Sequence, residues 1–257
     1  MSLLMSVIKK ILPLTFLFGG SISYTHADLV ELNSTTTDRI EMLTSTLANG
    51  TYADSDDSSK TTQFNTEISE SPQVVLQEDY KHLNIKPLYK NSVVKYFPKS
   101  REYYEIKKFP NNIHMYKSAD KNFALFLDLD MDDPYKSAWS VNCQIDQITD
   151  EKICAVLKYE FMLMRSSKTG WSLTVSKEIE RLNTYRYHYL RVDKNTPFKT
   201  KLIFNGSSVN PIINQMKNGQ TLYTRFYEWS DFYEETISLY GFSAAYETMN
   251  LIYSQLK

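Results

Sequence analysis

The chain has 257 residues, of which 42% are hydrophobic and 23% are charged, and its formal net charge at pH 7 is −1. This length suits one large domain, or one domain with an appendage. The basic residues are scattered rather than clustered, which argues against a nucleic-acid partner.

The first 27 residues have the pattern of an export signal. Lys9 and Lys10 precede a short apolar run, residues 11–18, and Thr25-His26-Ala27 is a cleavage triplet. The run is shorter than the roughly 20 residues that span a bilayer, which favours cleavage after Ala27 over a retained anchor. We therefore expect a periplasmic, secreted or cell-surface protein with no transmembrane segment after cleavage.

Residues 28–71 predict a flexible acidic leader, because they are rich in Ser, Thr, Asp and Asn and poor in apolar residues. From Asp28 to Tyr80 there are 11 acidic and two basic residues, whereas Lys81 to Lys257 contain 25 basic and 19 acidic residues. Either the leader only aids solubility, or the basic body faces an anionic surface such as lipopolysaccharide, phospholipid or a glycan.

Residues 72–257 predict a β domain, since short runs rich in β-branched and aromatic residues alternate with turn residues. The expected strands cover residues 92–97, 103–109, 113–116, 122–127, 138–143, 153–159, 170–175, 185–192, 199–204, 221–226 and 234–239. Many short strands without alternating helices are typical of a sandwich or barrel. We expect a mainly β fold, an antiparallel β-sandwich with a short helix and a C-terminal covering helix.

The two helices are predicted from their ends and their periodicity. Asn210, Pro211 and Gly219 mark the beginning and the end of a helix over 210–219. A second helix over 243–256 has apolar residues at helical spacing, and we expect it to cover the sheet. Those residues are Ala244, Ala245, Thr248, Leu251, Ile252 and Leu256.

Cys143 and Cys154 predict a structural disulfide, because paired cysteines in an oxidising compartment are usually bonded. The alternative, a redox or metal pair, is favoured by a C-x-x-C spacing that these cysteines lack. Two strands that flank a hairpin would bring the cysteines together. Trp139, Val141 and Cys143 then share one face, which we expect to be the inner one.

No motif predicts a catalytic residue, a cofactor or a metal site. Residues 128–133 are acidic, but Asp133 and Trp139 stand where an EF-hand needs Gly and Glu, which favours an acidic turn over a calcium loop. The chain has neither a G-x-S-x-G motif nor a Gly-rich phosphate loop. The histidines after the signal fall in separate segments without zinc-site spacing: His82, His114 and His188.

The most distinctive strand is residues 185–191, in which Tyr185, Tyr187, Tyr189 and Arg191 alternate with other residues and would share one face. If that face is exposed to solvent, it is an aromatic and basic platform for a glycan or a protein partner. If it is buried, the rings are cross-strand packing. The sequence leaves both readings open.

A set of landmarks over residues 135–248 resembles the invasion-associated locus B family of Gram-negative bacteria. In chain order they are Trp139-Ser140-Val141-Asn142-Cys143 with Cys154, Val192-Asp193, Gln215-Met216-Lys217-Asn218-Gly219-Gln220 and Ser238-Leu239-Tyr240-Gly241-Phe242-Ser243-Ala244-Ala245. The resemblance implies an exported single-domain β-sandwich with a role in entry into host cells. Family members often carry a second cysteine pair, where this chain reads Asn205-Gly206-Ser207-Ser208.

The matched glycines have physical roles that do not depend on the family. We expect Gly219 to end its helix with a positive φ, which glycine adopts at little cost. We expect Gly241 to permit a sharp turn into the last helix and Phe242 to anchor that helix on the sheet.

The sequence therefore predicts a non-enzymatic binding protein of the bacterial envelope or surface, whose partner is a protein or glycan in the envelope or on a host cell. Two alternatives remain. One is a periplasmic accessory or inhibitor that binds one partner by edge-strand pairing, and the other is an envelope hydrolase with an unrecognised site. Converging carboxylates in a deep cleft would favour the enzyme, and a flat aromatic face or an open edge strand would favour binding.

Overall fold

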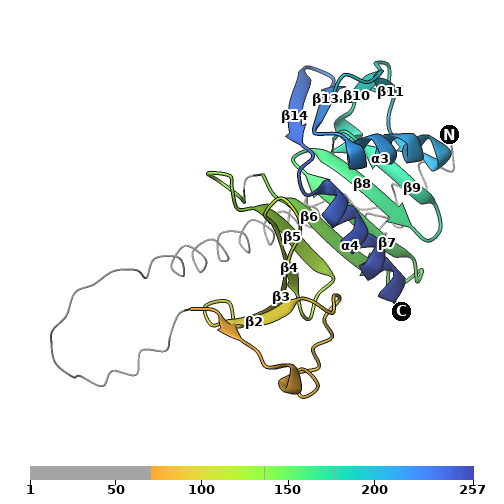
Figure 1. Cartoon of the computed structure of the whole chain (residues 1–257). Helices are drawn as coiled ribbons and strands as arrows, with labels where there is room; N and C mark the ends of the chain where they lie inside the picture. Colours follow the sequence, from red (N-terminus) through yellow and green to blue (C-terminus); the bar gives the residue numbers. More distant parts are fainter. Residues whose placement is uncertain (1–70, 136, 177) are drawn as a thin grey trace. The chain divides into compact units, whose positions relative to one another are not determined.

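The computed structural model describes residues 71–135, 137–176 and 178–257. The predicted signal peptide, residues 1–27, and all but the last residue of the predicted leader, residues 28–71, lie outside the described residues. The described elements are two antiparallel sheets, two α-helices and short 3₁₀ turns (Figure 1). The predicted mainly β, antiparallel fold with a short helix and a C-terminal covering helix is confirmed.

The larger sheet is a ten-stranded meander in the order β1-β2-β3-β4-β5-β6-β7-β8-β9-β12. Each strand from β1 to β9 therefore pairs with its neighbour in sequence. Its strands are β1 Gln73–Val74, β2 Val93–Phe97, β3 Glu102–Lys108, β4 Ile113–Ser118, β5 Phe123–Asp128, β6 Trp139–Ile145, β7 Lys152–Lys158, β8 Phe161–Ser166, β9 Gly170–Thr174 and β12 Phe204–Asn205.

Strand β8 was not predicted from the sequence. Residues 161–166 contain two methionines and no β-branched residue, so they lack the usual strand composition. The turn before the strand is also unmarked, because Tyr159 rather than Gly or Asn adopts the positive φ, 51°, that the turn from β7 requires. The pairing of Val156 with Leu163 places the strand firmly in the core, since both side chains are fully buried.

The smaller sheet has four strands in the order β11-β10-β13-β14. They are β10 His188–Val192, β11 Phe198–Thr200, β13 Thr221–Tyr227 and β14 Phe232–Ser238. The predicted strand over 199–204 is wrong as one element. It is divided into β11 and β12, which belong to different sheets.

Helix α3, Val209–Asn218, begins one residue before the predicted cap, because Ser208 and not Asn210 occupies the N-cap position. The predicted positive φ at Gly219 is also wrong, since its φ is −91°. Glycine is required there by close packing instead. A Cβ atom on Gly219 would lie 2.3 Å from Cγ1 of Val192, at the end of β10.

Helix α4, Phe242–Gln255, covers strands β5, β6 and β7 (Figure 1). Gly241 has a φ of 83° and makes the predicted sharp turn into the helix. The Phe242 ring is fully buried and lies 5.2 Å from the Trp139 ring. Within the helix, Met249 is buried and Leu251 is 38% exposed, so the covering face differs from the predicted one at Leu251.

A disulfide joins Cys143 on β6 to Cys154 on β7. The two residues lie directly opposite each other, and their Cα atoms are 4.0 Å apart. Trp139, Val141 and Cys143 are all buried and alternate with less buried residues, so the inner face of β6 is the predicted one. The bond therefore ties two strands of the core under α4.

One lysine is buried in the same layer. Lys158, at the end of β7, is only 4% exposed, and its Nζ donates a hydrogen bond of 3.0 Å to the carbonyl oxygen of Ser238. The Nζ atom also lies 5.1 Å from the centre of the Trp139 ring. Burial lowers the pKa of Lys158 to about 8, against a smaller opposite effect of Asp128.

A buried carboxylate fixes the segment that precedes β2. Glu105 on β3 is 1% exposed and accepts hydrogen bonds from the backbone N–H groups of Leu88 and Tyr89, at 2.7 and 2.8 Å. The Ser92 hydroxyl donates a third bond to the same carboxylate, at 2.6 Å. These bonds satisfy donors that no strand or helix would otherwise pair.

Candidate functional site

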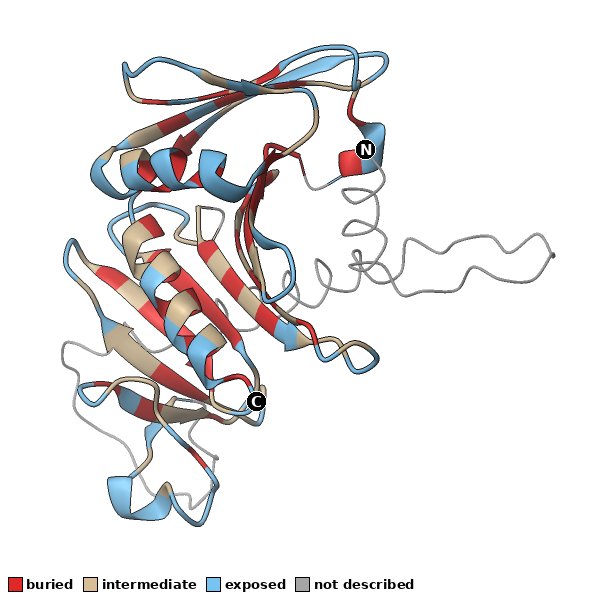
Figure 2. Ribbon diagram, turned by 90° about the vertical axis from the view of Figure 1, so that its right-hand side faces the viewer, coloured by how far each residue is buried: buried red, intermediate tan, exposed pale blue. Residues whose placement is uncertain are grey.

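The smaller sheet has one open face. Helix α3 contacts β10 on one side of the sheet, and no described element lies over the other side (Figure 2). Side chains of β10 and β13 alternate accordingly. The buried residues under the sheet are His188, Leu190, Val192, Leu222, Thr224 and Phe226, and the outward residues are Tyr189, Arg191, Tyr223, Arg225 and Tyr227.

The strand register brings aromatic and basic residues together on this open side. Tyr189 lies opposite Lys199 of β11 and also opposite Arg225 of β13, while Arg191 lies opposite Tyr223. We call this surface the tyrosine–arginine face. It consists of Arg186, Tyr187, Tyr189, Arg191, Lys199, Lys201, Tyr223, Arg225 and Tyr227.

Cations are held over the tyrosine rings. The Arg191 guanidinium lies 5.0 Å from the centre of the Tyr223 ring. The Nζ atoms of Lys199 and Lys201 lie 4.9 and 5.5 Å from the centre of the Tyr187 ring. These distances lie within the range of cation–π attraction, so the rings restrain the charged groups without neutralising them.

A further cation–π pair and one ion pair complete the face. The Arg186 guanidinium lies 4.4 Å from the Tyr227 ring centre. Arg225 forms an ion pair with Glu234 of β14, and this hydrogen-bonded carboxylate raises the pKa of Arg225. No carboxylate among the described residues pairs with Arg186, Arg191, Lys199 or Lys201. The face therefore carries an excess of positive charge.

Bare aromatic rings lie at the end of the face near the turn between β13 and β14. Tyr185, Trp229 and Phe232 are 79%, 63% and 62% exposed. The Tyr185 and Trp229 rings lie 5.8 Å apart at an angle of 68°. Phe232 extends the group toward the face, because its ring lies 6.2 Å from that of Tyr227. Large exposed rings grouped in this way are typical of binding surfaces.

A buried histidine lies beneath the face. His188 is fully buried, and its Nδ1 accepts a hydrogen bond of 3.1 Å from the backbone N–H of Tyr227. Burial lowers the pKa of His188 below the ordinary histidine value. The imidazole is therefore held neutral near pH 7 and serves as packing and as a backbone acceptor, so it is not a solvent-facing base.

The structure places the four residues of the predicted platform in two groups. Tyr189 and Arg191 share the outward face of β10. Tyr187 precedes the strand and lies beside Lys199 and Lys201, and it is 44% exposed. Tyr185 belongs to the bare aromatic group at the end of the face, because β10 begins only at His188. None of the four is a core residue.

The residues that β13 and β11 add to the face were not predicted from the sequence. Residues 221–227 read Thr-Leu-Tyr-Thr-Arg-Phe-Tyr, and the outward positions Tyr223, Arg225 and Tyr227 have the same alternation of aromatic and basic residues as β10. That period-two signal was available in the sequence. The adjacency of β10 and β13 was not, because about 30 residues separate the two strands.

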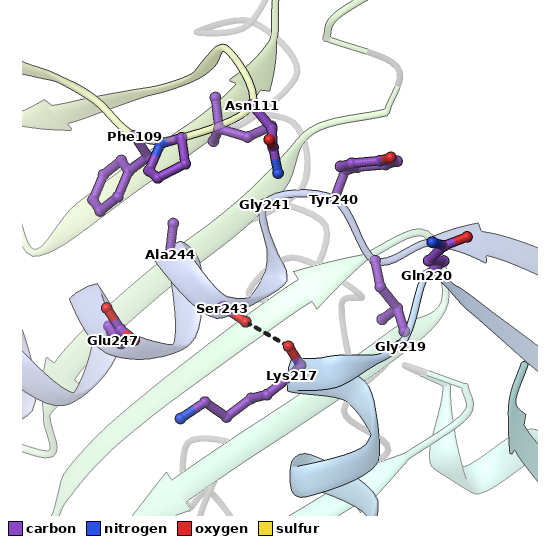
Figure 3. Close-up of a pocket in the computed structure, with 13 residues that line it drawn as sticks. Phe109, Asn111, Lys217, Gly219, Gln220, Tyr240, Gly241, Ser243, Ala244 and Glu247 are labelled. Carbon is purple, nitrogen blue, oxygen red and sulfur yellow. Dashed lines mark hydrogen bonds between the residues drawn. The ribbon is translucent and has the colours of Figure 1, made fainter. Parts of the chain in front are cut away.

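The structure also contains a pocket of about 460 Å³ between the β3–β4 turn and the facing ends of α3 and α4 (Figure 3). Phe109, Asn111 and Tyr240 line it, and the Ser243 hydroxyl donates a 3.2 Å hydrogen bond to the carbonyl of Lys217 at its edge. Glu247 is the single carboxylate among the lining residues that the structure describes. The pocket thus lacks a pair of carboxylates for acid–base chemistry.

Within residues 71–257, apart from 136 and 177, no group of three or more His, Cys, Asp or Glu side chains is placed to hold a metal ion. Among the helices that the structure describes, none combines the length and the apolar character needed to span a bilayer.

Comparisons with known families, with curated proteins and with solved structures found nothing that matches this chain. The resemblance to the invasion-associated locus B family therefore stays a prediction.

Proposed function

We propose that this protein is an exported, non-enzymatic binding protein of the bacterial envelope or cell surface, and that it binds its partner through the tyrosine–arginine face. In line with the resemblance to the invasion-associated locus B family, the role we propose is that of an envelope or host-interaction factor. The location we propose is the periplasm or the cell surface, after cleavage of a signal peptide near Ala27.

The single observation that carries this proposal is the gathering on one sheet face of four cations that have no carboxylate partner among the described residues. Arg191, Lys199 and Lys201 lie over tyrosine rings on this one sheet face. Charges that are held in place in this manner lose little side-chain entropy when a partner binds. A sheet face of this kind is suited to recognition rather than to turnover.

The disulfide supports the proposed compartment. Bonded cysteines persist in oxidising compartments and are rare in the reducing cytosol of mesophiles. The bond between Cys143 and Cys154 is accordingly what an exported domain is expected to contain. The predicted cleavage site itself can be tested by sequencing the N-terminus of protein recovered from periplasmic extract, which is expected to begin at Asp28.

The binding role is tested by capture from an envelope extract with a crosslinker. The test variant is Tyr187→Ser/Tyr189→Ser, and the matched control is Ile148→Ser/Tyr159→Ser, whose side chains are exposed on turns of the larger sheet. We expect wild type and control to yield the same crosslinked species, with crosslinks at Lys199 or Lys201, and the test variant to lose it at an unchanged melting temperature.

Two results would contradict the proposal. Equal capture by the test variant would show that the face does not bind. A large fall in the melting temperature of the test variant would show that the two rings serve the core.

A further inference from the structure

We infer that the ligand of the tyrosine–arginine face is an acidic polysaccharide, whose carboxylates bind Arg191, Lys199 and Lys201 and whose sugar rings pack on Tyr185 and Trp229. The inference rests on the proposed function of the same face and names the chemistry of its ligand.

The charge of the face selects an anionic ligand. Arg186, Arg191, Lys199 and Lys201 have no carboxylate partner among the described residues, and the one carboxylate paired on the face, Glu234, already binds Arg225. A guanidinium donates two parallel hydrogen bonds to a carboxylate, and an ammonium adds a point charge. An incoming carboxylate therefore gains contacts that the protein itself does not supply.

The arrangement of the cations favours a polymer over a small anion. Lys199 of β11 lies opposite Tyr189 of β10, and Arg191 lies two residues further along β10, so the Cα atoms of the two cations are roughly 8 Å apart. Lys201 follows immediately after β11. The face is open and solvated, so each single ion pair contributes little. A chain that carries a carboxylate on successive units can engage several cations at once, and these weak contacts then act together.

The bare rings favour a sugar polymer. Tyr185 and Trp229 are 79% and 63% exposed, and no cation lies over either ring among the described residues. The face of an aromatic ring is electron-rich, and the C–H groups of a pyranose carry a partial positive charge, so the two surfaces attract each other. The rings lie at the end of the cationic face, where a bound chain would continue.

The composition of the face argues against a folded protein partner. Arginine and tyrosine are enriched at protein–protein interfaces, but lysine is depleted there, and this face carries two lysines. Here Lys199 and Lys201 lie over the Tyr187 ring, which is still 44% exposed. Burying these ammonium groups under a protein would cost their hydration, whereas a hydrated polysaccharide leaves it largely in place.

The test measures binding of the full chain to three polymers of equal length. Polygalacturonate fragments are the probe, their carboxyl-reduced form is the neutral control, and poly-L-glutamate is a polyanion without sugar rings. We expect polygalacturonate to bind, to weaken as salt is raised, and to bind more tightly than poly-L-glutamate. The carboxyl-reduced polymer is expected to bind at least 10-fold more weakly, since about three ion pairs are lost.

Three variants assign the contacts. Arg191→Gln/Lys199→Gln/Lys201→Gln is expected to weaken polygalacturonate binding by roughly 10- to 100-fold. The control Lys81→Gln/Lys86→Gln/Lys90→Gln removes the same charge from exposed positions elsewhere and is expected to bind like wild type. Tyr185→Ser/Trp229→Ser is expected to weaken polygalacturonate binding about 5-fold and to leave poly-L-glutamate binding unchanged.

Several outcomes overturn the inference. Equal binding of the carboxyl-reduced polymer would exclude carboxylate recognition. Equal binding of poly-L-glutamate, without an effect of Tyr185→Ser/Trp229→Ser, would identify an acidic polypeptide as the ligand class. If no polymer binds while envelope capture still depends on the face, the ligand class is wrong and the proposed function stands. If capture does not depend on the face either, both fail.

Discussion

Substitution of the buried Lys158 by methionine is expected to remove a pH dependence of stability. The Lys158 ammonium is 4% exposed, and burial lowers its pKa to about 8 from the ordinary value of 10.5. Between these two values the unfolded chain binds more protons than the folded chain, so the free energy of unfolding rises with pH. At neutral pH Lys158 is protonated in both the folded and the unfolded chain, and burial of its charge lowers the free energy of unfolding by about 3 kcal/mol.

The size of the effect follows from the two pKa values. Between pH 7 and pH 9.5 the contribution of Lys158 to the free energy of unfolding is expected to rise by about 2 kcal/mol. Tyr116, whose pKa burial raises to about 12, is present in both proteins and cancels in the difference between them. Lys117, whose pKa burial also lowers, is present in both proteins and cancels in the difference.

The assay is urea denaturation of wild type, Lys158→Met and the exposed control Lys90→Met at half-unit steps of pH, with the disulfide intact. The difference between wild type and Lys158→Met should change by about 2 kcal/mol over this range, and that between wild type and Lys90→Met should stay constant. A constant difference for Lys158→Met would refute the account of a charge buried under α4.

Four further results are expected. Reduction of the disulfide at Cys143 should lower stability by about 3 kcal/mol and the melting temperature by roughly 5–10 °C, and an unchanged transition would contradict its structural role. Gly219→Ala should lower the melting temperature, because the added Cβ atom would collide with Val192, even though any residue can adopt the φ of Gly219. A melting temperature equal to that of wild type would show that Val192 and β10 shift at little cost. Glu105→Ala should lower the free energy of unfolding by about 3 kcal/mol in urea denaturation. Glu105→Gln should lower it clearly less, because the amide oxygen still accepts hydrogen bonds. Equal losses for the two variants would show that the charge of the carboxylate, and not its role as acceptor, is responsible. Burial lowers the pKa of His188, so as the pH falls the imidazole is protonated in the unfolded chain before it is protonated in the folded one. The free energy of unfolding should therefore fall as the pH drops below about 6.5, and His188→Gln should reduce this fall in an acid titration.

Much of the fold could be predicted from local patterns. Runs that end at Pro98 and Pro110, and the alternation of buried residues from Trp139 to Cys143, located β2, β3 and the inner face of β6, although the short strand β1 was not predicted. Local reasoning works there because each strand pairs with its neighbour in sequence. It failed at β8, where a turn at Tyr159 without Gly or Asn hid the boundary between two strands.

The candidate site was harder to predict, because it depends on long-range pairing. Alternation placed Tyr189 and Arg191 on one face, but the residues that decide its character, such as Lys199 and Tyr223, come from other strands. Gly219 illustrates the same limit. Glycine is required at position 219 because the Val192 side chain on β10 packs against it, and the sequence rules for helix ends do not include such a contact.

The order of the strands has a consequence for biogenesis. From β1 to β9 each new strand can add to the one just made, so the contacts of the large sheet are mostly local and suit rapid assembly as the polypeptide emerges. The lid over Trp139, however, is helix α4, which is the last described element to be synthesised. Until α4 has been synthesised and has packed on the sheet, a large apolar surface stays exposed to water and prone to aggregation. A chaperone that shields nascent sheets would act during this interval.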